Sequence, residues 1–88
     1  MTEKQIRMGA AVTSLSDFVG VPKGTVGIID EDYGTGIMVA WDLPDQHLPK
    51  NYKKYDGRPA FQSNILRDGF DKEDELQYLH LVESGNKF

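Results

Sequence analysis

The chain of 88 residues contains no cysteine, two histidines and one tryptophan. Without cysteine, disulfides and thiolate metal sites are excluded, which suits a reducing compartment. The chain also has no apolar run of about 18 residues, the length that a membrane-spanning helix needs. Residues 1–12 lack the apolar stretch of a secretory signal. We therefore expect a cytoplasmic protein without a membrane partner.

Catalytic and cofactor-binding motifs are missing as well. There is no G-x-S-x-G turn to hold a nucleophilic serine and no phosphate-binding glycine loop, and the only histidines are His47 and His80. The acidic run Asp30-Glu31-Asp32 does not continue as a calcium loop, because Gly34 and Trp41 stand where further carboxylates are required. The sequence predicts a non-enzymatic protein with no metal and no organic cofactor.

What the chain does contain is a pair of strand-like segments. Thr25–Ile29 and Ile37–Trp41 are rich in β-branched residues and are bounded by glycine, proline or aspartate. They predict a β-hairpin whose acidic tip contains Gly34 and Gly36 at positive φ. In the second segment Ile37, Val39 and Trp41 share one face, as in a half-buried strand.

Further strands are predicted on either side of this hairpin. The first is expected near residues 9–13, and a fourth at Ala60–Leu66, with Asp68-Gly69 as the turn after it. For the C-terminal region we expect a helical turn at Asp71–Glu75 and a closing strand at Gln77–Glu83. The alternative is one continuous helix, since Leu76, Leu79 and Val82 also recur with helical spacing. The predicted core consists of Val12, Val26, Ile28, Ile37, Val39, Trp41, Phe61, Leu79 and Leu81.

Together these elements predict a mainly β fold, a single small barrel of about five strands over residues 1–88. A chain of this length supports one modest core. Residues 43–60, which contain three of the four prolines, are expected to form a long loop after the third strand. Residues 1–8 and 84–88 are expected to be flexible.

Residues 9–42 resemble the opening strands of SH3-like small barrels. The resemblance is carried by Gly9-x-x-Val12, an aromatic-bearing loop, and the segments Pro22–Ile29 and Ile37–Asp42. The KOW family, with its G-x-G-x-V turn and strand, is the closest named pattern. GTVGII followed by VAWD is also similar to the Mind bomb family domain and, more loosely, to Tudor domains. The resemblance implies a binding module, because such barrels bind nucleic acids, peptides or proteins. The ALYDY-like segment and paired tryptophans of a polyproline groove are absent.

Charge alternates along the chain. Net charge is −4 overall, but residues 30–45 carry −5 and residues 46–67 carry +4. Overall acidity argues against non-specific polyanion binding. The loop interleaves basic side chains with tyrosines, a combination that suits an acidic protein surface or a nucleic-acid strand. Alternatively, its tyrosines only hold the loop against the barrel.

These observations predict a module that docks on a larger protein partner, such as a small inhibitor or accessory protein. The alternative is a KOW-like nucleic-acid-binding domain that uses residues 50–58. The oligomeric state is left open. Trp41 and Tyr33 join the candidate partner contacts, although Trp41 is also expected to be a core or half-buried residue. The full set of candidates is Lys50, Tyr52, Lys53, Lys54, Tyr55, Arg58, Tyr33 and Trp41.

Overall fold

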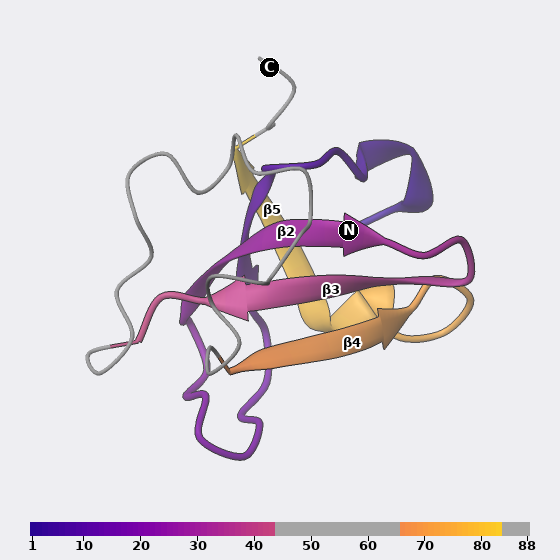
Figure 1. Ribbon diagram of the computed structural model, residues 1–88. Helices are drawn as coiled ribbons and strands as arrows, with labels where there is room; N and C mark the ends of the chain where they lie inside the picture. The colour runs from indigo at the N-terminus through magenta and orange to yellow at the C-terminus, as the bar shows by residue number, and fades with distance from the viewer. Residues whose placement is uncertain (44–65, 84–88) are drawn as a thin grey trace.

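The computed structural model describes residues 1–43 and 66–83. Its fold is mainly β, as predicted, and five antiparallel strands form one sheet in the order β4-β3-β2-β1-β5. The sheet curls into a half-barrel (Figure 1). Two short 3-10 turns, η1 and η4, accompany the strands. The bounds are η1 Glu3–Gln5, β1 Ala11–Ser14, β2 Val26–Asp32, β3 Gly36–Trp41, β4 Arg67–Asp71, η4 Leu76–Tyr78 and β5 Leu79–Glu83.

The β2–β3 hairpin forms where the sequence predicts it. Tyr33 N–H donates to the Gly36 carbonyl over 3.0 Å, and the Asp32 carboxylate accepts from Gly34 N–H over 3.0 Å. Gly34 has the predicted positive φ, of 92°. Gly36 does not, so that part of the prediction is wrong. It is a buried position where an added Cβ would lie 2.7 Å from the Phe70 carbonyl oxygen, so glycine is needed there for space.

The predicted inward face of β2 is wrong. Val26 is 41% exposed and Ile28 is partly buried, whereas Ile29 is fully buried. The reason lies on the next strand, because Gly27 pairs with Trp41 and a Cβ on Gly27 would lie 2.7 Å from the indole Cε3. Gly27 and Ile29 therefore face the core. A register shift between Ile29 and Glu31 marks a β-bulge at Asp30.

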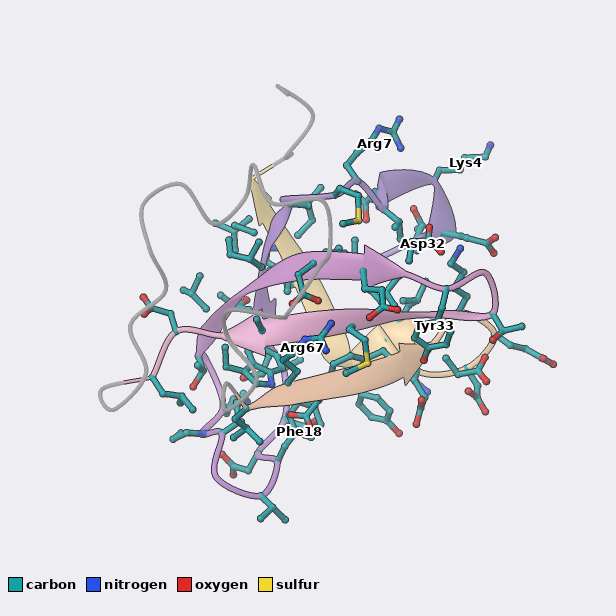
Figure 2. The ribbon with its side chains drawn as sticks, in the orientation of Figure 1. Lys4, Arg7, Phe18, Asp32, Tyr33 and Arg67 are labelled. Atoms are coloured by element: carbon teal, nitrogen blue, oxygen red, sulfur yellow. The ribbon has the colours of Figure 1, made fainter. Side chains whose placement is uncertain are left out.

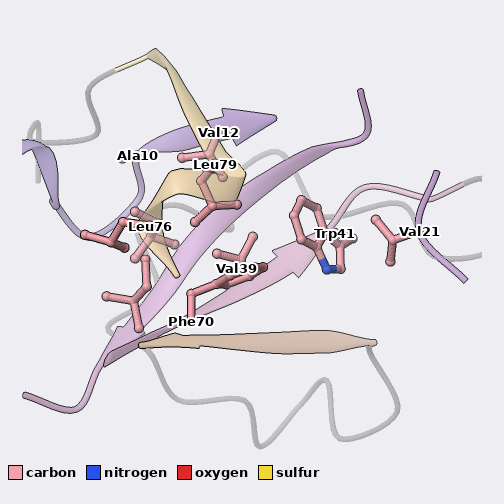
Figure 3. Close-up of a cluster of buried hydrophobic side chains, with 10 residues drawn as sticks. Ala10, Val12, Val21, Val39, Trp41, Phe70, Leu76 and Leu79 are labelled. Atoms are coloured by element: carbon pink, nitrogen blue, oxygen red, sulfur yellow. The ribbon is translucent and has the colours of Figure 1, made fainter. Parts of the chain in front are cut away.

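The core lies inside the curl of the sheet (Figure 3). The predicted core residues Val12, Ile37, Val39, Trp41 and Leu79 are confirmed as fully buried. Leu81 is partly buried and packs against this cluster, while Phe61 lies outside the described residues. The sequence did not identify the buried side chains Ala10, Val21, Ile29, Phe70 and Leu76 as core residues.

The predicted turn at Asp68-Gly69 is wrong. β4 starts at Arg67, and the predicted Asp68-Gly69 turn lies inside it, where these residues pair with Val39 and Met38. Residues 60–65 lie outside the described ranges. Phe70 explains the difference, since its burial on the inner face draws the segment around it into the sheet. Gly69 fits this strand because a Cβ there would lie 3.2 Å from both Met38 Sδ and Tyr33 Oη.

The C-terminal region is a turn followed by a strand, as predicted, and the continuous helix is wrong. Residues 72–75 form turns, η4 follows, and β5 pairs with β1. Two hydrogen bonds between Asp71 and Glu75 close the turn. Asp71 N–H donates to Glu75 Oε1 over 2.7 Å, and Glu75 N–H donates to the Asp71 carbonyl over 2.9 Å. The α-amino group of Met1 lies against the same region, donating to the carbonyls of Leu76 and Leu79.

Truncation of two valines tests which face of each strand is buried. Val39→Ala should lower the free energy of unfolding by about 2 to 3 kcal/mol, because Val39 is fully buried and the cavity cannot fill. Val26→Ala should lower it by less than about 1 kcal/mol, since Val26 is 41% exposed. Urea denaturation of both variants provides the measurement. Equal losses would contradict the inward face assigned to β2.

A second substitution tests the contact between β2 and Trp41. Gly27→Ala should destabilise the fold by about 1 to 3 kcal/mol, because the new methyl group would lie 2.5 Å from Val39 Cγ1 and 2.7 Å from Trp41 Cε3. In the double variant Gly27→Ala, Trp41→Phe, the phenyl ring is smaller than the indole. The added methyl group should therefore destabilise the Trp41→Phe protein less than it destabilises the wild type. Thermal denaturation of the wild type, the two single variants and the double variant gives the coupling free energy between positions 27 and 41. An additive result would show that Trp41 does not restrict this position.

Candidate protein-interaction surface

The structure places only two of the partner-contact residues predicted from the sequence, Tyr33 and Trp41. The remaining six lie outside the described residues: Lys50, Tyr52, Lys53, Lys54, Tyr55 and Arg58. Trp41 is fully buried, and its indole Nε1–H donates to Asp68 Oδ2 over 2.7 Å. Its expected role in the core is confirmed. A partner cannot reach its side chain in this structure.

Tyr33 lies at the tip of the β2–β3 hairpin and is 47% exposed (Figure 2). Its hydroxyl group lies over Gly36 and Gly69, so both glycines leave room for the ring. Beside it, Lys72 Nζ lies 2.9 Å from Asp32 Oδ1. The Lys72 hydrogen bond, helped by the Gly34 N–H, lowers the pKa of Asp32 below its usual value. Tyr33 is thus accessible, and the acidic group next to it already has a basic partner.

A second charged group lies where β2 and β4 approach each other across β3. Arg67 donates Nε–H to Asp30 Oδ2 and an Nη2–H to Asp30 Oδ1, both over 2.8 Å. It also donates to Glu31 Oε1 over 3.0 Å. The side chain of Asp30 is only 2% exposed and that of Arg67 is 15% exposed. Such a buried, two-pronged ion pair binds β4 to the bulge of β2 and has a structural role.

A partly accessible aromatic cluster is organised by Phe18. Its ring centroid is 6.1 Å from that of Trp41, 5.6 Å from that of Phe70 and 6.3 Å from that of Tyr78. Trp41 and Phe70 are buried, whereas Phe18 is partly buried and Tyr78 is 38% exposed. Phe18 therefore connects the core to the molecular surface.

The loop that carries Phe18 is held by backbone hydrogen bonds. Phe18 and Val21 exchange two backbone hydrogen bonds of 2.8 Å, and Gly20 provides the positive φ, of 78°, that this tight turn needs. At the base of the loop, Lys23 N–H donates to Asp17 Oδ1 over 2.7 Å. Val19, at the tip of the turn, is 98% exposed. The turn presents an apolar side chain to solvent on a hydrogen-bonded support.

Other exposed apolar side chains surround this turn. Leu15, 45% exposed, donates its N–H to the Tyr78 carbonyl over 2.8 Å, and Leu66, 37% exposed, lies beside Gly20. We call this set the Phe18 surface; it consists of Leu15, Phe18, Val19, Leu66 and Tyr78. Exposed apolar side chains gathered around a rigid turn are typical of protein-interaction sites.

The sequence contains a partial signal for this surface. Phe18 is visible as an aromatic residue in a loop between two strands, but nothing in the sequence places it next to Tyr78, which follows it by 60 residues. The sheet brings the two together, because β1 pairs with β5 and η4 leads into β5. The order of the strands thus creates the candidate site.

Comparison of the chain with family models, curated proteins and solved structures finds no match. Within residues 1–43 and 66–83, no group of three histidine, aspartate or glutamate side chains could hold a metal ion. The same part of the chain contains no helix long and apolar enough to cross a membrane. The candidate site therefore rests on its geometry.

The pKa of Asp32 provides a test of the hairpin tip. Lys72→Met should raise it toward the usual value, because the main hydrogen bond to the carboxylate is lost. In the wild type the lowered pKa means that Asp32 contributes stability above its unfolded pKa and loses this contribution as the pH falls through the folded value. NMR titration of the carboxyl carbon measures the shift. Lys23→Met, which removes a basic residue that makes no ion pair with Asp32, is the control and should leave the pKa unchanged.

The Arg67 ion pair provides a second test. Arg67→Met should lower the free energy of unfolding by about 3 kcal/mol, because the buried Asp30 carboxylate loses its two-pronged partner. Adding Asp30→Asn removes the buried charge, so the double variant should be more stable than Arg67→Met alone. Chemical denaturation provides both values. A double variant that is no more stable than the single one would show that the charge of Asp30 is not what makes Arg67 necessary.

Proposed function

We propose that this chain is a non-enzymatic binding module of the SH3-like small-barrel type that docks on a larger protein partner through the Phe18 surface. The barrel type is supported by the strand order β4-β3-β2-β1-β5 and by the 3-10 turn that precedes the last strand. The absence of cysteine suits a reducing cytoplasm.

One observation carries the docking proposal: a hydrogen-bonded turn holds Val19 98% exposed next to the partly buried Phe18, whose ring contacts that of Tyr78, a residue 38% exposed. An aromatic ring that is anchored in the core loses little conformational freedom on binding. An apolar residue at the tip of such a turn fills a partner's pocket and excludes water around it. The surface thus combines an anchor with a pre-organised support.

Charge separates this proposal from nucleic-acid binding. The described residues contain twelve acidic and five basic side chains, a net charge of −7, and the remaining residues carry +3. The phosphates of a nucleic acid are repelled by this barrel surface, and binding through residues 50–58 would have to overcome that repulsion. Protein docking through the Phe18 surface does not depend on phosphate contacts.

Replacement of exposed valines tests the proposal. Val19→Ser should change the free energy of unfolding by less than about 0.5 kcal/mol, since the side chain is almost fully exposed. It should weaken partner binding by about fivefold or more if Val19 enters a pocket. Val82→Ser, at a valine 55% exposed on β5, is the matched control and should leave binding unchanged.

The assay is affinity capture from the native lysate with mass spectrometry, with and without nuclease. Capture that survives nuclease and is reduced only by Val19→Ser supports the proposal. Capture that nuclease abolishes would favour the alternative function through residues 50–58. Equal capture by the wild type and both variants would show that the Phe18 surface is not the docking site.

A further inference from the structure

Three acidic side chains near the Phe18 surface differ from those that are paired with Arg67 and Lys72. Asp30, Glu31 and Asp32 have basic partners, in Arg67 and Lys72. Asp17, Asp68 and Glu75 are each connected to the Phe18 surface through the chain or through a hydrogen bond, and none of them forms an ion pair with another described residue. Among the residues that the structure describes, these three carboxylates therefore have no basic partner.

These carboxylates are held in place by groups that do not neutralise them. Asp17 accepts from the Lys23 backbone N–H, Asp68 from the Trp41 indole and Glu75 from the Asp71 backbone N–H, all over 2.7 Å. Asp17 directly precedes Phe18 in the chain. Asp68 accepts a hydrogen bond from the indole of Trp41, on which Phe18 packs. The backbone carbonyl of Glu75 accepts a hydrogen bond from the Tyr78 N–H. Each carboxylate has further lone pairs for an incoming donor.

We propose, as an extension of the proposed function, that the partner presents arginine or lysine side chains next to an apolar residue. The apolar residue packs against Val19 and Phe18, and the cationic groups lie between Asp17, Asp68 and Glu75. Tyr78 adds an exposed aromatic face over which a guanidinium group gains cation–π energy. Charges at the rim of an interface favour a partner surface of opposite charge and accelerate association, while the apolar centre supplies most of the affinity.

Conservative variants test the charges without removing the hydrogen bonds. The triple variant Asp17→Asn, Asp68→Asn, Glu75→Gln retains an acceptor oxygen at each position, so the loop, the indole and the turn keep their partners. The control Glu3→Gln, Glu73→Gln, Asp74→Asn removes the same net charge from exposed side chains and leaves both Asp71 and Glu75 unchanged. Comparison of the two separates a local effect of charge from the effect of net charge.

The probes are two synthetic peptides, one alternating arginine with leucine and one alternating glutamate with leucine, titrated into the labelled full chain and followed by NMR. We expect the arginine–leucine peptide to shift the amides of residues 15–21, 66–68 and 75–78. The triple variant should weaken this binding by about tenfold or more, whereas the control should weaken it by much less. The glutamate–leucine peptide should not shift these amides.

Several results would overturn the charge inference. These are equal binding of both peptides, shifts confined to residues 71–74, or equal weakening by the triple variant and its control. Capture of the lysate partner by the triple variant at the wild-type level would also overturn the charge inference. In that case, the docking proposal would still stand if Val19→Ser reduced the capture. If Val19→Ser left capture unchanged, the proposed function itself would fail.

Discussion

The contact between Trp41 and Gly27 is the constraint on which the rest of the structure depends. The indole can lie across β2 only because Gly27 has no side chain, and this contact determines which face of β2 points into the core. Asp68 holds the indole N–H, so the ring is fixed from β4 as well as from β2. In the small core of a short chain, one large aromatic side chain fixed from two strands determines the positions of its neighbours.

The candidate site follows from this arrangement. Phe18 packs on Trp41 and Phe70, so its ring anchors the loop between β1 and β2 to the core (Figure 2). The Phe18–Val21 turn then projects Val19 into solvent, and the pairing of β1 with β5 brings Tyr78 to the same place. A core contact thus positions a surface feature, and the surface is pre-organised because its support is buried.

The carboxylates of the barrel fall into two groups that differ in their hydrogen-bond partners. Near the β-bulge and the hairpin tip, Arg67 and Lys72 neutralise carboxylates and connect β4 and the turn that follows it to β2. Around Phe18 the carboxylates instead accept hydrogen bonds from neutral N–H groups. The first arrangement stabilises the fold. The second leaves these carboxylates without a basic partner among the described residues.

Local sequence determined the class of the fold. The alternation of Ile37, Val39 and Trp41 identified a strand and its buried face, and the acidic tip with Gly34 identified the hairpin. The C-terminal turn and strand were also predictable, because Asp71 and the leucines that follow it carry local signals for both. These features depend on interactions within a few residues or between adjacent strands, which the order of amino acids reveals directly.

Only the tertiary structure decided the inward face of β2, the start of β4 and the location of the Phe18 surface. Both Ile28 and Ile29 can fill a core, so alternation alone does not choose between them; the choice depends on Trp41 from the next strand. Asp68-Gly69 has the composition of a turn, but Phe70 and the pairing with β3 place it in a strand. Phe18 and Tyr78 meet because of strand order. Contacts between residues distant in sequence override local preference wherever they bury more apolar surface than the local alternative.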